Sequence, residues 1–187
     1  MGPCRSTGVA APRWVSQVKR HLLTDPYRAV IQCFNRTGVR CVVVGMSGIN
    51  YYARSPAETF ATLDYDIFLE PVQSNVKKAI EGLQKMGFQL GTSAGIFKLD
   101  ELKGLVRDRK TLVATTPEGL MVELILEVSG YPFSEMIKDS ATFTVRGVPI
   151  HVARLNKLLR SKKIAGRPKD RRFLERYEDL LKEDEER

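Results

Sequence analysis

Residues 63–69, with the sequence LDYDIFL, are the part of this chain that most narrows what it can fold into. Side chains alternate across a β-strand, so Asp64 and Asp66 are expected to share one face. The opposite face would carry the apolar set Leu63, Tyr65, Ile67 and Leu69. The strand would then present two carboxylates about 6.5–7 Å apart along its length. Two such carboxylates can coordinate one hard divalent cation.

A β-branched run at residues 42–44 precedes this segment and predicts a buried strand. The run ends at Gly45-Met46-Ser47-Gly48, a glycine-bearing turn where backbone can approach a ligand closely. Successive backbone N–H groups in such a turn favour anions, which makes Gly45 and Ser47 candidates for gripping a phosphate. Two strand-held acids facing a glycine turn therefore predict a metal-assisted phosphate site.

A third acid, Glu123, stands inside the otherwise apolar strand-like run LMVELIL at residues 120–126. Burying this carboxylate alone would cost several kcal/mol or raise its pKa. Facing Asp64 and Asp66, it could stay ionised by sharing a Mg²⁺ ion, with Mn²⁺ as the alternative. The competing interpretation is that all three acids are solvated on the exposed face of an antiparallel sheet.

The remaining pattern predicts an α+β fold, a small mixed β-sheet flanked by helices with a helical C-terminal segment. Strands are expected at residues 42–44, 63–69, 110–115, 120–128, 143–145 and 148–151. Helices are expected at residues 26–35, 49–53, 74–86 with Ser74 as cap, 131–138, from 155 to a stop at Gly166, and from Pro168 onward. A short amphipathic helix is also expected around Trp14, Val18 and Leu22. We predict a disordered leader over 1–12, a core over 13–152 and C-terminal helices over 153–187 packed on it.

The composition limits the kinds of partner, metal ion and cellular compartment that are expected. No run is long and apolar enough to span a bilayer, so no membrane partner is expected. Three cysteines without a C-x-x-C pair predict reduced thiols in a cytoplasm. Two histidines disfavour zinc, so a metal should be oxygen-bound. The net charge of +8 suits a nucleotide or nucleic acid.

Gly87, Gly91 and Gly95 are interpreted as hairpin or loop glycines, because no G-x-x-x-x-G-K-[ST] pattern is present.

The glycine turn followed by Asp64-Tyr65-Asp66 resembles the nucleotidyltransferase superfamily, the group related to DNA polymerase β and the small antibiotic-modifying adenylyltransferases. Gly45 fills the first glycine position, and Met46 stands where a second Gly or Ser is usual. In the abortive-infection toxin-like subgroup an Arg-x-Thr precedes the acidic motif. This chain keeps Thr62 but has Phe60 in place of the Arg. Glu123 matches the third acidic position of the superfamily, which is more often Asp.

A C-terminal run, LLRSKKIAGRPKD at residues 158–170, is similar to a segment of the same subgroup. That resemblance implies Lys162 as a phosphate ligand, with Arg167 and Asp170 as a structural pair. Lysine is a compact point charge suited to phosphate. Most of the neighbouring cations are interpreted as a solvated helical face: Arg160, Lys163, Lys169, Arg171 and Arg172.

The resemblance implies a Mg²⁺-dependent enzyme that moves a nucleoside monophosphate from a nucleoside triphosphate to a hydroxyl of a small molecule, RNA or protein. Asp64, Asp66 and Glu123 would be the catalytic and metal-binding residues. The nucleotide-binding set would be Gly45, Ser47, Thr62 and Lys162. A toxin-like role would further imply an antitoxin partner.

Three other interpretations stay open. The chain could be a catalytically inactive relative that binds a nucleotide or a protein, which Met46 and Phe60 favour. A metal-dependent nuclease ranks lower, because its Asp…Glu-x-Lys pattern needs Lys where Ile125 stands. A basic RNA-binding module without chemistry would bind RNA in a salt-sensitive way.

Overall fold

The computed structural model describes residues 25–185, where it contains seven α-helices, two 3-10 helices and eight β-strands. The helices are α2 (Asp25–Thr37), α3 (Gly45–Asn50), α4 (Gln73–Lys85), α5 (Leu102–Arg107), α6 (Phe133–Lys138), α7 (Leu155–Ala165) and α8 (Pro168–Glu185), with 3-10 turns η1 (Pro56–Glu58) and η2 (Leu99–Glu101). The strands are β1 (Cys41–Val43), β2 (Asp64–Leu69), β3 (Gln89–Thr92), β4 (Gly95–Ile96), β5 (Leu112–Thr115), β6 (Met121–Ile125), β7 (Ala141–Val145) and β8 (Val148–Val152). The predicted leader and the helix around Trp14 lie outside the described residues.

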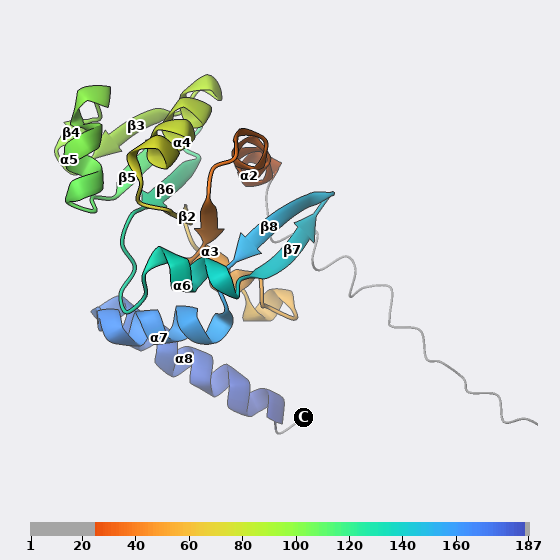
Figure 1. The fold of residues 1–187 in the computed structure, drawn as a ribbon. Helices are drawn as coiled ribbons and strands as arrows, with labels where there is room; N and C mark the ends of the chain where they lie inside the picture. The colour runs from red at the N-terminus through yellow and green to blue at the C-terminus, as the bar shows by residue number, and fades with distance from the viewer. Residues whose placement is uncertain (1–24, 186–187) are drawn as a thin grey trace, which may run out of the picture.

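All eight strands form one mixed sheet in the order β4-β3-β5-β6-β2-β1-β8-β7. At its centre β2 runs parallel to β6 and antiparallel to β1, and β1 pairs in parallel with β8. The other pairings are antiparallel. Helices cover both faces of the sheet (Figure 1). The predicted α+β class and the mixed, helix-flanked sheet are therefore confirmed.

Two apolar cores occupy the two faces of the sheet, as the alternation of side chains along its central strands requires. Along β1 and its continuation, Val43 enters one core and Val42 and Val44 enter the other. The first core receives apolar side chains of α2, α4 and α5. The second receives Ile49 of α3 and residues of α6, α7 and α8, including Leu158 and Phe173. The acids of β2 and β6 share the second face.

The helix after β1 begins four residues earlier than predicted. The sequence pattern placed it at residues 49–53, but α3 starts at Gly45 itself. Gly45 has φ +63°, a left-handed conformation that glycine adopts without steric cost. The chain therefore turns at once, and the N–H of Gly48 donates to the carbonyl of Val44 at 2.8 Å. The glycine turn is the first turn of the helix.

Two smaller expectations were wrong. Ser74 lies inside α4 and is not its cap, because the carbonyl of Val72 already accepts hydrogen bonds from Asn75 and Val76. Leu63 is 87% exposed because β2 begins one residue later, at Asp64.

The hairpin interpretation of the glycine-rich segment is confirmed, since β3 and β4 pair across residues 93 and 94. The predicted hairpins β5–β6 and β7–β8 are also present.

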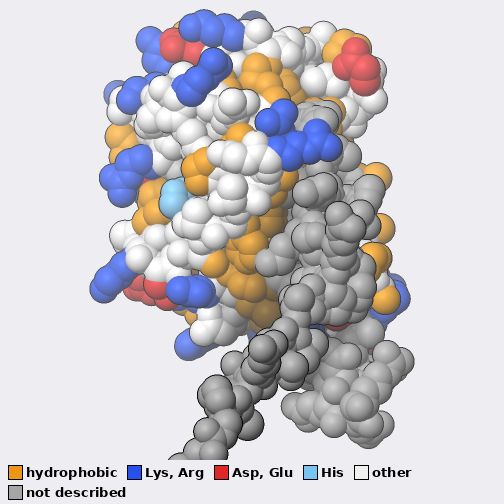
Figure 2. Space-filling model, turned by 90° about the vertical axis from the view of Figure 1, so that its right-hand side faces the viewer, with side chains coloured by type: hydrophobic (Ala, Val, Ile, Leu, Met, Phe, Trp, Pro, Cys, Tyr) orange, Lys and Arg blue, Asp and Glu red, His pale blue; other side chains and the backbone are white. Residues whose placement is uncertain are grey.

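None of the helices within residues 25–185 combines the length and the apolarity that a membrane crossing needs. On the face turned to the viewer in Figure 2, Lys and Arg side chains stand in small separate groups with hydrophobic side chains between them.

Candidate metal centre and adjoining cavity

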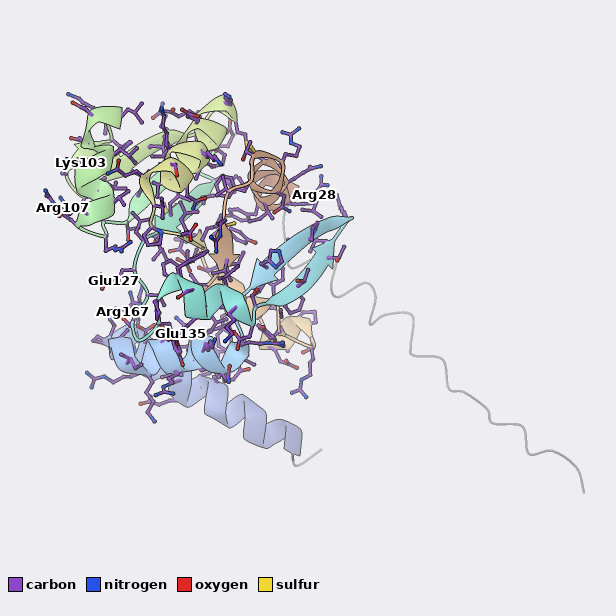
Figure 3. The ribbon with its side chains drawn as sticks, in the orientation of Figure 1. Arg28, Lys103, Arg107, Glu127, Glu135 and Arg167 are labelled. Carbon is purple, nitrogen blue, oxygen red and sulfur yellow. The ribbon has the colours of Figure 1, made fainter. Side chains whose placement is uncertain are left out.

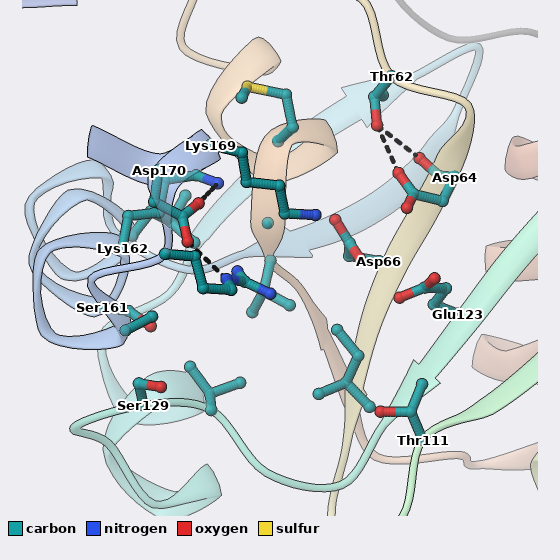
Figure 4. A pocket seen from close by; sticks show the side chains of 18 of the residues that line it. Thr62, Asp64, Asp66, Thr111, Glu123, Ser129, Ser161, Lys162, Lys169 and Asp170 are labelled. Atoms are coloured by element: carbon teal, nitrogen blue, oxygen red, sulfur yellow. Dashed lines mark hydrogen bonds and ion pairs between the residues drawn. The ribbon is translucent and has the colours of Figure 1, made fainter. Parts of the chain in front are cut away.

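Three carboxylates converge at the centre of the sheet. Asp64 and Asp66 come from β2 and Glu123 comes from β6, and the parallel register places Glu123 directly beside Asp66. One carboxylate oxygen from each lies within 4.8 Å of the others (Figure 4). The structure thus brings together the three acids that the sequence analysis selected.

The alternation of β2 explains why these acids reach the site. Tyr65 and Ile67 point to the opposite face, where they are 1% and 0% exposed. Burying them anchors the strand in one orientation, because a slip by one residue would exchange every side chain between the faces. Asp64 and Asp66 are therefore held at the open side of the sheet, half-buried.

Gly45 lies against the carboxylate of Asp66. A β-carbon added at Gly45 would come 1.8 Å from Oδ2 of Asp66, far inside contact distance. The backbone N–H of Met46 donates to the same carboxylate. Glycine is therefore required at position 45 for two reasons: the backbone has a positive φ, and there is no space for a side chain.

The Ser47 side chain is hydrogen-bonded to the backbone of β2 and does not line the cavity. This side chain is buried, and its hydroxyl donates to the carbonyl of Val44 at 3.2 Å while accepting from the N–H of Asp66 at 3.0 Å. The structure therefore places the Ser47 side chain among backbone contacts and outside the lining of the cavity.

Thr62 lies at the mouth of the cavity. It is exposed, and its hydroxyl donates to Oδ1 of Asp64 at 2.5 Å. The loop that carries Thr62 is tied to α3 by the side chain of Asn50. The Asn50 amide donates to the carbonyl of Phe60 at 2.8 Å and accepts from its N–H at 2.9 Å.

Burial, and after it the crowding of negative charge, raises the pKa of two of the three carboxyl groups. Burial, followed by the charges of Asp64 and Glu123, raises the pKa of Asp66 to about 7, against an opposing effect of Lys162. Burial and then the charge of Asp64 also raise the pKa of Glu123, which Lys169 and Arg167 oppose. Both shifts show that the folded chain holds these carboxylates where a positive charge would be stabilising.

A cavity of about 650 Å³ opens beside the acids. Its floor includes Gly45 and the three carboxylates, and Glu127 and Ser129 follow from β6. The wall opposite belongs to α7, α8 and the turn between them, which contribute Lys162, Arg167, Lys169 and Asp170.

The predicted pair Arg167–Asp170 is present, with Nε of Arg167 2.6 Å from Oδ2 of Asp170. Asp170 is 1% exposed and also accepts from Nζ of Lys162 at 3.1 Å. The Lys162 ammonium additionally lies 5.2 Å from the centre of the Phe173 ring. Lys162 therefore lines the cavity, with its ammonium held on the α8 side.

Lys169 was missed by the sequence analysis, which interpreted it as part of a solvated face. It lines the cavity, extends toward Asp66 and affects the pKa of Glu123 (Figure 4). The signal was present, since Lys169 adjoins Asp170 in the first turn of a helix that begins at Pro168. Only the docking of that turn beside α7, across the cavity from the acids of β2 and β6, shows where the side chain goes.

Phe60, which replaces an Arg in the resemblance, packs on the C-terminal helix. Its ring lies 4.7 Å from that of Phe173 and 6.3 Å from that of Tyr177, centre to centre. The Arg176 guanidinium lies 5.8 Å from the Phe60 ring centre. The loop before β2 is thus joined to α8 by aromatic contacts.

No protein-family model and no curated protein sequence matches this chain.

Proposed function

We propose that this protein is a metal-dependent nucleotidyltransferase with a nucleotidyltransferase-like fold, acting on a nucleoside triphosphate and an acceptor hydroxyl. The observation that carries the proposal is the meeting of three carboxylates within 4.8 Å, at the floor of a cavity whose opposite wall is cationic. A site that is acidic at one end and basic at the other suits a metal ion together with a polyphosphate.

The donors fit Mg²⁺ or Mn²⁺. Asp64, Asp66 and Glu123 offer only oxygen ligands, which hard divalent ions prefer over nitrogen and sulfur. The raised pKa values of Asp66 and Glu123 are the response expected of a carboxylate cluster that a cation would relieve. Such an ion, when bound, neutralises phosphate charge and lowers the pKa of an acceptor hydroxyl.

The remaining residues would orient the substrates. Gly45 leaves room for Asp66 to face the cavity, and Thr62 holds Asp64 by a hydrogen bond. Lys169 and Arg167 would meet the triphosphate, with Lys162 shared between Asp170 and phosphate. In the reaction the acceptor oxygen bonds to the α-phosphorus and loses its proton to solvent. The bond from that phosphorus to the bridging oxygen breaks, and pyrophosphate leaves.

The test is transfer of label from each of four α-³²P-labelled nucleoside triphosphates in the presence of Mg²⁺, with a cell extract as the source of acceptors. We expect the double variant Asp64→Asn/Asp66→Asn to lose transfer by at least a hundredfold. The matched control is Asp100→Asn/Asp108→Asn, which removes the same charge at exposed sites and should retain activity. Equal activity in all three proteins would refute the proposal.

One observation favours a second candidate, an inactive relative that binds a nucleotide or protein. The Lys162 ammonium already has Asp170 and the Phe173 ring as partners. Calorimetry with a non-hydrolysable ATP analogue separates the two. Binding that strengthens with Mg²⁺ supports the enzyme, whereas binding indifferent to Mg²⁺ and to the Asp64→Asn/Asp66→Asn change supports the binding module.

A further inference from the structure

Positive charge is concentrated in residues 154–177, which form the helical wall of the cavity, whereas the end of α8 is acidic. Residues 154–177, comprising α7 and the first part of α8, contain ten Lys or Arg and two acidic residues, a net charge of +8. The whole chain also has a net charge of +8, from 30 basic and 22 acidic residues. The other residues are therefore balanced, with 30 less 10 basic and 22 less 2 acidic, or twenty of each.

Most of this charge faces solvent outside the cavity. Besides Arg154, which precedes α7, five cations of this segment are exposed and do not line the cavity: Arg160, Lys163, Arg171, Arg172 and Arg176. We call these five the cationic hairpin surface. Of the two acids in the segment, Asp170 is buried and already bonded to Lys162 and Arg167, which leaves Glu175 as the exposed one.

Acidic side chains occur along β6 and on the segment between β6 and α7, where Figure 3 shows Glu127 and Glu135 close to Arg167. Glu127 lines the cavity and is exposed, and Glu135 is an exposed residue of α6 (Figure 3). Together with Asp64, Asp66 and Glu123 they make the β6–α6 side negative. The charge is thus divided, with acids where a metal ion would be held and cations along the adjoining helices. A chain of phosphates could lie on the helices while one of its hydroxyls reaches the acids.

We infer that the cationic hairpin surface binds a nucleic-acid strand and that this strand is the acceptor of the transferred nucleotide. The chemistry of transfer rests on the proposed function, whereas the binding does not. A flexible strand can place a sugar hydroxyl inside a cavity of about 650 Å³. A flat anionic membrane would contact the same cations but would leave its headgroups outside. The new bond joins the sugar oxygen to the α-phosphorus, and pyrophosphate leaves as before.

Binding is tested by fluorescence anisotropy with a labelled 20-nucleotide single-stranded RNA, and with DNA of the same sequence, from 50 to 300 mM KCl. The test variant is Arg160→Gln/Lys163→Gln/Arg172→Gln. The control is Lys78→Gln/Lys85→Gln/Lys103→Gln, which removes three exposed cations from α4 and α5; Lys103 lies toward the upper end of the molecule in Figure 3, whereas α7 and α8 form the lower end. We expect the test variant to weaken binding at least tenfold, with the salt slope falling by about 2, and the control to change it less than threefold.

Each outcome decides something. Preference for RNA over DNA, or the reverse, identifies which sugar supplies the acceptor. Equal weakening by the two triple variants, or no wild-type binding at 50 mM KCl, overturns the inference. So does tighter binding to vesicles of phosphatidylserine and phosphatidylcholine than to either strand.

The Asp64→Asn/Asp66→Asn protein separates this inference from the proposed function, because it should bind the strand as the wild type does. Strand binding without any transfer would refute only the enzyme. Transfer to a small molecule without strand binding would refute only this inference.

Discussion

Gly45 is the residue on which the geometry of the acidic cluster depends most directly. It combines φ +63° with a contact to Asp66 that excludes any side chain. Gly38 has nearly the same backbone conformation, φ +64°, but nothing lies within 4 Å of where its β-carbon would be. Substituting each glycine by alanine therefore distinguishes two effects: backbone strain alone at Gly38, and backbone strain together with overlap with the Asp66 carboxylate at Gly45.

We predict that Gly38→Ala lowers the free energy of unfolding by about 1 kcal/mol, the cost of the left-handed conformation. Gly45→Ala should lower it by about 3 kcal/mol, because the methyl group must also displace the Asp66 carboxylate. Urea denaturation measures both values, and calorimetry with Mn²⁺ should show metal affinity lost only in Gly45→Ala. Equal destabilisation by both substitutions would contradict the close contact at Gly45.

Asp66 gives the site its pH dependence. Its folded pKa of about 7 lies above the usual value near 3.9 for an unfolded Asp. The folded state therefore binds the proton more tightly than the unfolded state. The carboxylate is neutral in both states below about pH 4, and its destabilising effect grows as the pH rises from about 4 to about 7.

We predict that Asp66→Asn, in the absence of divalent metal, is more stable than the wild type at pH 8 by about 2–4 kcal/mol. The difference should vanish near pH 4, where residue 66 is neutral in both proteins. Thermal denaturation with EDTA across this range measures it. Adding Mg²⁺ at pH 8 should stabilise only the wild type and so narrow the gap. A difference independent of pH would show that burial and neighbouring charge do not control this carboxylate.

Among the elements, the loop between α3 and β2 is the one that local sequence describes least. It carries Thr62 to Asp64, and the side chain of Asn50 pairs with both backbone groups of Phe60. Phe60 in turn packs on α8. The loop therefore connects the short helix, the acidic strand and the C-terminal helix.

Asn50→Ala should release this loop. Losing two hydrogen bonds to the backbone should cost about 1–2 kcal/mol, and amide hydrogen exchange at Phe60 should accelerate at least tenfold. Asn35→Ala is the control, since Asn35 makes one exposed hydrogen bond, to the carbonyl of Pro149, and does not contact the loop. Unchanged exchange at Phe60 in Asn50→Ala would show that the aromatic contacts alone hold the loop.

For the molecule as a whole, the site depends on joining the C-terminal hairpin to the middle of the sheet. Leu158 and Phe173 enter the same apolar core as Val42 and Phe68. Asp170 adds a buried polar connection through Lys162 and Arg167. Burial opposes ionisation of Asp170, but its hydrogen bonds to Arg167 and Lys162 outweigh this and lower its pKa.

We predict that Asp170→Ala destabilises the protein by about 3 kcal/mol, because it leaves the mostly buried ammonium of Lys162 without its carboxylate. Asp139→Ala also removes a salt bridge to a lysine, Lys157, but the Asp139 side chain is 49% exposed. That change should cost much less than Asp170→Ala, because an ion pair at the surface is screened by solvent and contributes little to stability. Chemical denaturation compares them, and Asp170→Asn, which keeps the shape, should fall between. Equal costs for the two alanine variants would refute the structural role of the buried pair.

The period-two pattern of residues 64–69 was enough to predict that Asp64 and Asp66 share a face and that Tyr65, Ile67 and Leu69 are buried opposite. It was enough because alternation is a local property of any strand. The first residue of β2 was harder to place, so the pattern put Leu63 on the apolar face of the strand although its side chain is exposed.

The register of β2 against β6, which sets Glu123 beside Asp66, joins residues far apart in the sequence and depends on how both apolar faces pack. The same holds for Lys169. The position of its side chain follows from where α8 docks in the molecule and not from the local sequence of that helix. Local chemistry therefore named the three carboxylates, while long-range packing of two cores on one sheet made them neighbours and brought a cationic hairpin to face them.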